Sequence, residues 1–242
     1  MTEATLVLLP SIALDDTSWR WLDLPADVRV ATPVYPGHGT TGDWLPGVSL
    51  DDVADMIAAA YPGPLEVAGI SLGGILAQHL AVRHPDRVRS LLIAGTTAHS
   101  DPATMTGRAE AVESNPNNND YSEQTLRRWF TSEALAQVPE HPGVAYARRR
   151  LAAMPGRSFG AAWRAMAGHD LRGRLRGLPA RVTIVAGQGD QAAPPEAMRE
   201  FAAEFDRPRF EVLAAPHLMQ LETPEAFSAV LRRHLSPADV AS

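Results

Sequence analysis

The stretch Glu66-Val67-Ala68-Gly69-Ile70-Ser71-Leu72-Gly73-Gly74-Ile75-Leu76-Ala77-Gln78 contains the feature that decides the fold. An apolar run typical of a buried strand stops at Gly69, and a helical apolar pattern begins two residues later. Between them lies one hydroxyl, Ser71, flanked by Gly69 and Gly73. Gly-x-Ser-x-Gly between a strand and a helix is the pattern of a nucleophile elbow, a turn so sharp that the neighbouring side chains must be absent. The stretch therefore predicts a strand, a tight turn that presents the serine, and a helix.

Short apolar runs recur along the chain, and each is followed by a turn signal and a helical pattern. They are continuous rather than alternating, which indicates strands buried on both faces of a parallel sheet. Helices are predicted after a capping Ser49, from Leu72 to Arg83, and from Thr223 onward. Strands and helices in alternation predict an α/β fold with a doubly wound, mostly parallel sheet of about six strands. The predicted strands are residues 5–9, 28–31, 65–70, 88–94, 182–186 and 210–213.

One segment departs from this alternation. From residue 99 to residue 177 no run is strand-like, and a polar loop, Asn115-Pro116-Asn117-Asn118-Asn119, interrupts the helical patterns. A structureless loop of that length is improbable inside a compact domain. We therefore predict a core of residues 1–98 and 178–242, with residues 99–177 inserted as a helical cap over the sheet and hinged near the Asn-rich loop.

Composition limits the partners. The 242 residues carry a net charge of −6, contain no cysteine and are 45% hydrophobic. An acidic balance argues against nucleic acid or an anionic membrane as the main partner, and the absence of cysteine excludes disulfides and thiolate metal sites. The first apolar run has no basic residue before it, unlike a secretory signal, and no run approaches the roughly 20 residues of a membrane span. We expect a soluble, cytoplasmic protein without cofactors, of undetermined oligomeric state.

A serine hydroxyl is a poor nucleophile without a base, and the base needs an orienting group. After an elbow, the acid and then the histidine are expected behind later strands, because the carboxyl ends of parallel strands share one edge of the sheet. Asp190 follows the predicted strand at 182–186, and His217 follows the one at 210–213. We therefore predict a catalytic triad of Ser71, His217 and Asp190.

Other histidines and one other acid compete for these roles. His38 and His99 are expected near the same edge of the sheet, and Asp101 is a rival for the acid. No His-x-x-x-His pair or other metal-ligand spacing occurs, so no metal is expected. The five remaining histidines, interpreted as lying on or after the elbow helix or at surface and cap positions, are His79, His84, His141, His169 and His234.

The elbow also predicts an oxyanion hole, the pair of donors that stabilises a tetrahedral intermediate. The N–H groups and dipole at the start of the following helix favour an oxyanion, and Leu72 supplies one N–H there. A second donor is expected from the loop after the first strand, Leu9-Pro10-Ser11-Ile12-Ala13-Leu14. Pro10 has no N–H, so Ile12 is the predicted donor.

These motifs resemble those of the α/β-hydrolase family. The matching pieces are Gly-Ile-Ser-Leu-Gly at 69–73, Pro-Gly-His-Gly at 36–39, Gly-Gln-Gly-Asp at 187–190 and Pro-His-Leu-Met-Gln-Leu-Glu-Thr-Pro-Glu-Ala-Phe at 216–227. The chain begins at the strand before the oxyanion loop. Compared with the family, we therefore expect the first β-hairpin to be missing. Within the family the chain most resembles the 3-oxoadipate enol-lactonases, through Pro10-Ser11, Ile93-Ala94-Gly95-Thr96-Thr97-Ala98, Arg128-Trp129-Phe130-Thr131, Asp170-Leu171-Arg172 and Pro194-Pro195-Glu196.

The function that the motifs and the resemblance imply is hydrolysis of a small carboxylic ester or lactone through an acyl-enzyme. Thioester hydrolysis, C–C bond hydrolysis and cofactor-free perhydrolysis use the same constellation, and a non-catalytic ligand-binding member is the alternative from another class. An enol-lactone carries a carboxylate, so one cap arginine is expected to face the pocket: Arg128, Arg148 or Arg164. Trp129 is expected either to close the pocket over a small ring or to hold the cap helices together.

Overall fold

The computed structural model describes residues 4–114 and 119–236. Six strands form one sheet in the order β2-β1-β3-β4-β5-β6, and every neighbouring pair is parallel. This confirms the predicted α/β fold with a doubly wound sheet. The strands are β1 (Thr5–Leu9), β2 (Arg29–Ala31), β3 (Leu65–Ile70), β4 (Val88–Ala94), β5 (Arg181–Gly187) and β6 (Arg209–Leu213).

The strand order reverses between β1 and β3. After β1 the chain moves outward to β2, then returns to the other side of β1 to form β3 and the strands beyond it. The loops that leave the carboxyl ends of β1 and β3 therefore diverge, and in open α/β sheets ligands bind in the crevice that such a reversal leaves. The proposed nucleophile follows β3, and the proposed oxyanion loop follows β1.

Burial differs between the centre and the rims of the sheet. All residues of β1 are buried, as are all but one residue in each of β3, β4 and β5. The edge strands β2 and β6 contain no fully buried residue. The prediction that every strand is buried on both faces is thus wrong for the two edges, because an edge strand has a neighbouring strand on one side only.

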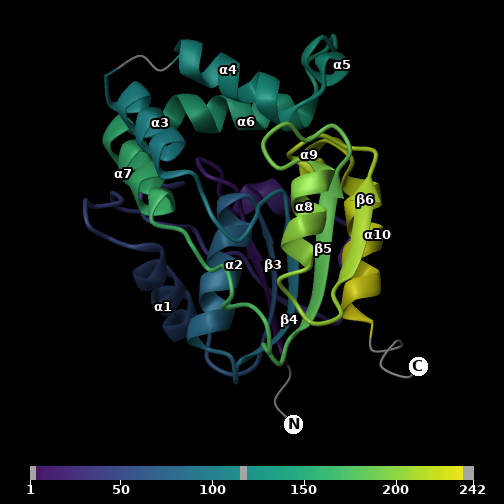
Figure 1. Cartoon of the computed structure of the whole chain (residues 1–242). Coiled ribbons are helices and arrows are strands. Elements are labelled where there is room, and N and C mark those ends of the chain that lie inside the picture. The colour runs from purple at the N-terminus through teal and green to yellow at the C-terminus, as the bar shows by residue number, and fades with distance from the viewer. Residues whose placement is uncertain (1–3, 115–118, 237–242) are drawn as a thin grey trace.

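The helix that follows the elbow lies at the centre of the molecule. Helix α2 (Leu72–Arg83) contacts β1, β3 and β4, and α1 (Leu50–Ala60) packs on it from outside. Ten of the 12 residues of α2 are buried, which explains its nearly uniform apolar composition. Figure 1 shows α1, α2 and α8 (Pro195–Ala202) in front of the sheet. The C-terminal segment contributes α9 (Met219–Glu222) and α10 (Pro224–Leu235).

Five helices stand between β4 and β5, and in the described part of this segment there is no strand. Figure 1 shows them gathered beyond one end of the sheet, and we call them the cap helices. Helix α3 packs against α7, and α4 packs against α6. The predicted hinge at the Asn-rich loop lies mostly outside the described residues, and the boundaries at 99 and 177 stay predictions. The cap helices are α3 (Pro102–Ser114), α4 (Asn119–Trp129), α5 (Ser132–Leu135), α6 (Pro142–Ala153) and α7 (Gly156–Ala167).

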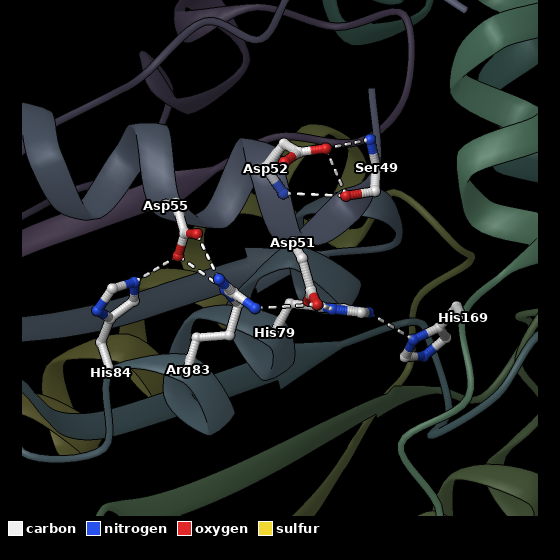
Figure 2. A network of polar contacts seen from close by, with 8 residues as sticks. All are labelled: Ser49, Asp51, Asp52, Asp55, His79, Arg83, His84 and His169. Atoms are coloured by element: carbon white, nitrogen blue, oxygen red, sulfur yellow. Dashed lines mark hydrogen bonds and ion pairs between the residues drawn. The ribbon is translucent and has the colours of Figure 1, made fainter. Parts of the chain in front are cut away.

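The two connections between core and cap helices lie side by side. His99 and Asp170 form an antiparallel bridge, and the Leu171 N–H donates to the Ala98 carbonyl over 2.8 Å. Figure 2 shows a polar network that joins α1, α2 and His169 of the second connection. His79 contacts Asp51 at 2.6 Å and His169 at 3.1 Å.

Two histidines contradict their interpretation as surface or cap positions. His169 is 1% exposed, and its Nε2 donates to the Thr97 carbonyl over 2.9 Å. His234 is 2% exposed, and its Nδ1 lies 2.8 Å from the Thr183 hydroxyl in β5. Both interpretations are wrong because each ring has a buried polar partner, which makes its burial tolerable.

Candidate active site

Ser71 occupies the corner between β3 and α2 with φ 55° and ψ −120°. This backbone conformation is strained for a residue with a side chain, and such strain concentrates at functional sites. A Cβ on Gly69 would lie 2.2 Å from the Gly73 carbonyl oxygen, and a Cβ on Gly73 would lie 1.9 Å from the Leu9 carbonyl oxygen. Both glycines are therefore required by close backbone approach. The predicted strand, tight turn and helix are all present.

His217 and Asp190 form a buried hydrogen-bonded pair. The His217 Nδ1 donates to Asp190 Oδ2 over 2.8 Å, and both residues are 3% exposed. The other carboxylate oxygen, Oδ1, accepts N–H groups of Ala192 at 2.7 Å and Ala193 at 3.0 Å. Burial raises the pKa of Asp190, but the neighbouring imidazole and these donors outweigh it, so the pKa lies below its ordinary value. The ionised carboxylate holds His217 in the tautomer that leaves Nε2 available as a base.

One cavity of about 260 Å³ brings the candidates together. Its walls include Ser71, His217 and Ile12, which come from three different loops. Gly95 lies beside the histidine with φ 59°, and a Cβ there would be 3.2 Å from the His217 ring. Sequence reasoning did not assign a role to Gly95. Its position directly after β4, at the same edge of the sheet, was the available signal.

The proposed oxyanion donors are placed at this cavity and at the start of the elbow helix. Ile12 lines the cavity, and within the described ranges no carbonyl accepts its N–H. Leu72 is the first residue of α2, so its N–H has no acceptor inside the helix. Both side chains are buried, which keeps water away from their backbone groups. The role of these two N–H groups as oxyanion donors stays a prediction.

Two of the competing residues, His38 and Asp101, are held by other contacts. His38 is fully buried away from this cavity, and its Nδ1 donates to the Pro36 carbonyl over 2.9 Å. Asp101 lines the cavity, but its carboxylate accepts the N–H and hydroxyl of Thr104 and so caps the start of α3. Those bonds lower the pKa of Asp101. His99 also lines the cavity, yet His217 is the lining histidine that is held by a carboxylate in the described part of the chain.

One cap arginine was expected to face the pocket, and of the three candidates the structure brings Arg128 to the cavity. Arg148 pairs with Glu123 of α4 and with Glu140, which lies between α5 and α6. Arg164 pairs with Glu113 at 2.6 Å and faces a different groove. Arg128 is therefore the one of the three candidates that the structure places at the pocket, and the charges of Arg148 and Arg164 are paired with carboxylates elsewhere.

A second arginine that sequence reasoning missed also lines the cavity. Arg108 lies on α3, on the same helical face as Asp101, Thr104 and Met105, which line the cavity too. These positions are three, four and seven residues after Asp101, the spacing of neighbours on one helix face. That spacing was the signal, but it indicates a face and not what the face covers.

Arg108 and Arg128 have no carboxylate partner in the ranges that the structure describes. Arg108 lies over the Trp163 ring at 4.8 Å, and Arg128 donates to the Thr125 hydroxyl over 2.9 Å. Burial and the charge of Arg128 lower the pKa of Arg108. This wall of the cavity therefore presents several donors and positive charge to its interior, a combination that suits an anion.

Trp129 contributes to the site through its side chain and its backbone. The ring lines the cavity and is 5% exposed. Its carbonyl accepts the N–H of Leu218, the residue after His217, over 3.2 Å. Trp129 therefore lines the cavity and joins the cap segment to the loop that carries His217, and its two interpretations, closing the pocket over a ring or holding the cap helices together, stay predictions.

Neither a metal centre nor a membrane span is found where the structure can be described. Residues 4–114 and 119–236 contain no group of three or more His, Asp or Glu side chains placed to hold a metal ion. Across the same residues, no helix is long and apolar enough to cross a membrane.

An all-parallel sheet with a serine at the strand-to-helix corner, beside a carboxylate-bound histidine from a later loop, is the architecture of the α/β hydrolases. The chain belongs to the alpha/beta hydrolase family, whose model matches residues 6–230. The family resemblance seen in the sequence motifs is thereby confirmed.

Two similar proteins are named as an esterase and as a lactonase. A pimeloyl-[acyl-carrier protein] methyl ester esterase of Chromobacterium violaceum is 33% identical over 213 residues, which cover 83% of this chain and 81% of that protein. The 3-oxoadipate enol-lactonase 1 of Acinetobacter baylyi is 28% identical over 235 residues, covering 92% of this chain and 85% of that protein.

Solved structures show the same fold. A thermophilic esterase from Thermogutta terrifontis, solved with malate bound, superposes with a TM-score of 0.86 at 26% identity and covers 96% of this chain and 89% of its own. The enol-lactonase from Burkholderia xenovorans gives a TM-score of 0.87 at 23% identity, with 97% of this chain and 92% of its own covered.

Proposed function

We propose that the protein is a serine hydrolase that cleaves a small carboxylic ester or lactone. The observation that carries this proposal is that Ser71, on a strained corner, and His217, held by Asp190 at 2.8 Å, line one cavity. The esterase and enol-lactonase relatives support hydrolysis of a carboxylic ester bond.

In the proposed mechanism, the Ser71 oxygen attacks the substrate carbonyl while His217 Nε2 takes the hydroxyl proton. The N–H groups of Ile12 and Leu72 receive the oxyanion of the tetrahedral intermediate. His217 returns the proton to the leaving oxygen as the ester C–O bond breaks and the acyl-enzyme forms. It then takes a proton from water, which attacks the acyl carbonyl, and gives that proton to the Ser71 oxygen as the bond from the acyl carbon to Ser71 breaks and the acid is released. Asp190 stays ionised and stabilises the imidazolium at each stage.

The charges that line the cavity favour a substrate with a carboxylate at a distance from the scissile bond. Arg108 and Arg128 line the wall formed by the cap helices, and their charges are not matched by a carboxylate in the described ranges. A guanidinium binds a carboxylate through charge-assisted hydrogen bonds, which are about twice as strong as neutral ones. The Thermogutta terrifontis esterase, whose structure contains the dicarboxylate malate, supports the same choice.

The size of the cavity favours a compact substrate. Its volume of about 260 Å³ lies just below the range of roughly 300–1,000 Å³ that is usual for small-molecule pockets. A small anionic lactone, or the half-ester of a short dicarboxylic acid, fits this space and this charge. We therefore infer that a lactone of the enol-lactone kind is a better substrate than a long-chain acyl ester.

Steady-state kinetics on a substrate panel test the proposal. The panel contains one anionic lactone, one neutral lactone of similar size, an acyl ester and the matching thioester, and each is assayed with the wild-type protein and with Ser71→Ala. We expect oxygen-ester turnover in the wild type only, with the anionic lactone giving the higher kcat/KM. Turnover by Ser71→Ala at the wild-type rate would refute the mechanism. A preference for the thioester would show that the substrate class is thioesters and not oxygen esters.

A further inference from the structure

The loop that carries the proposed oxyanion donor Ile12 is fastened at both ends by tyrosine hydroxyls. It leaves β1 at Pro10 and enters the 3₁₀ helix η1 (Asp16–Trp19). Ala13 within it has φ 66°, so the loop contains a left-handed residue that must be held in place. At the first end, the Tyr35 hydroxyl donates to the Pro10 carbonyl over 3.1 Å.

The second end of the loop is fastened by a cap helix. The Asp15 N–H donates to the Tyr146 hydroxyl over 3.0 Å, and that hydroxyl donates to Asp15 Oδ1 over 2.7 Å. Tyr146 lies on α6, 131 residues further along the chain. On the next turn of the same helix, Arg150 Nε lies 3.0 Å from Asp15 Oδ2 as an ion pair. Asp15 Oδ1 also accepts the Thr17 N–H over 3.1 Å, which caps η1.

This contact is shielded from solvent, so it is expected to be stiff. Tyr146 is 3% exposed, and the side chains of Arg150 and Asp15 are 19% and 12% exposed. Hydrogen bonds and ion pairs are stronger where water is excluded. Burial raises the pKa of Tyr146, so its hydroxyl stays protonated and remains a donor.

We propose that Tyr146 and Arg150 are positioning residues of the oxyanion hole: from α6 they fix Asp15, and through Asp15 they fix the Ile12 N–H three residues earlier. The inference rests on the proposed function, since it assigns the Ile12 N–H to the transition state. It adds that the cap helices complete the catalytic machinery as well as enclosing the substrate. A displaced donor stabilises the oxyanion less, while the binding of the neutral ground state is nearly unchanged.

The test compares Tyr146→Phe and Arg150→Gln with a matched control, Arg148→Gln. Tyr146→Phe removes the hydroxyl but keeps the ring, which packs edge-on against Trp21 at 5.5 Å between centroids. Arg148 is on the same helix as Arg150, but its ion pairs are with Glu123 and Glu140 and not with Asp15. Thermal melts establish that each variant is folded.

The readouts are kcat, KM and the inhibition constant of a phenylboronic acid. The boron accepts the Ser71 oxygen, His217 takes the proton, and the tetrahedral boronate places an oxygen where the oxyanion forms. Removing one oxyanion donor outright costs about 10²- to 10³-fold in kcat, so a displaced donor should cost roughly 10- to 100-fold. We expect Tyr146→Phe to lower kcat by that factor, to weaken the boronate in parallel and to change KM less than about twofold. The double variant with Arg150→Gln should lose less than the product of the single losses.

Three results would overturn the proposal. The first is a folded Tyr146→Phe whose kcat stays within about twofold of the wild type. The second is a loss in Arg148→Gln as large as in Arg150→Gln. The third is a rise in KM without a change in boronate affinity. Ser71→Ala separates this failure from that of the proposed function: if it is inactive while Tyr146→Phe is normal, only the positioning role is wrong.

Discussion

Two hollows lie on opposite sides of helix α7, and the smaller one is the candidate active site. The cavity at Ser71 measures about 260 Å³ and is lined from α7 by Trp163 and Met166. The groove on the other side measures about 560 Å³ and is lined from α7 by Ala161, Arg164 and Ala165. Volume alone would therefore point to a different hollow from the one that Ser71 and His217 line.

The hollows differ in how their charges are matched. In the groove, Arg157 pairs with Asp43 at 2.6 Å, Arg164 pairs with Glu113 at 2.6 Å, and Asp51 is held by His79 and Arg83. In the cavity, Arg108 and Arg128 lack such partners among the residues described. In an ion pair, each charge is matched within the protein. A charge without such a partner is available to match the opposite charge of a ligand. In this molecule the unmatched charge, and not the larger volume, coincides with the strained serine that we propose as the nucleophile.

The largest expected effect is loss of the nucleophile or its base. Ser71→Ala and His217→Ala should each lower kcat by roughly 10⁴-fold or more, and the double variant should lose little more, because the residues act as one unit. Asp190→Asn should also be severely impaired. Far-ultraviolet circular dichroism checks that the variants fold. If Asp101→Asn proves the damaging acid substitution instead, the orienting carboxylate has been misassigned.

The next effect separates the two hollows directly. Arg108→Gln and Arg128→Gln should each raise KM for an anionic lactone by roughly 30- to 1,000-fold, since a charged partner at a desolvated site contributes on the order of 2–4 kcal/mol. KM for a neutral ester of similar size should change less than about threefold. Equal effects on both substrates would show that these arginines shape the cavity without recognising an anion, and the anionic substrate class would then be abandoned.

A smaller effect concerns stability and pH at the polar network of Figure 2, whose Ser49, Asp51 and His79 line the groove. Burial lowers the pKa of His169 from 6.5 to about 4. The unfolded chain therefore binds one more proton between these values, and stability that is present above pH 6.5 is lost as the pH falls toward 4. The loss from this group is on the order of 2–3 kcal/mol. Urea unfolding at pH 5 and pH 7 should show a shallower pH dependence for His169→Gln; an unchanged dependence would contradict the assignment.

The smallest effect is expected from the paired charges of the groove. The side chains of Arg164 and Glu113 are 46% and 36% exposed, and exposed pairs contribute about 0–1 kcal/mol. Arg164→Gln should change the free energy of unfolding by no more than that, and KM for either lactone by less than about twofold. A large rise in KM for the anionic lactone in this variant would place the anion in the groove and reverse the comparison.

Local patterns predicted the elements that short stretches of sequence determine. The strands at Thr5–Leu9 and Val88–Ala94 and the helix at Leu72–Arg83 have the predicted bounds, because continuous apolar runs end at clear turn residues. The elbow glycines were also predictable, since the required close approach is encoded within five residues. Edge strands were harder, because burial depends on neighbours that the run itself does not contain.

Features that depend on distant partners could not be predicted. Arg108 has an unremarkable place on a polar helix, and only the packing of α3 over the cavity distinguishes it from Arg148. The burial of His169 depends on His79, 90 residues earlier, and the Asp15 contact with Tyr146 spans 131 residues. Such pairings leave no local periodicity, so the sequence indicates the residue types without indicating which ones meet.

The most direct test of the central claim is peptide mapping by mass spectrometry after reaction with a fluorophosphonate. The Ser71 oxygen displaces fluoride from phosphorus, and His217 accepts the hydroxyl proton. We predict one adduct per chain, located on Ser71, formed at least 100-fold more slowly in His217→Ala because the general base is lost. Absence of an adduct in the folded wild type, an adduct at another residue, or an equal rate in His217→Ala would contradict the claim that Ser71 is an activated nucleophile.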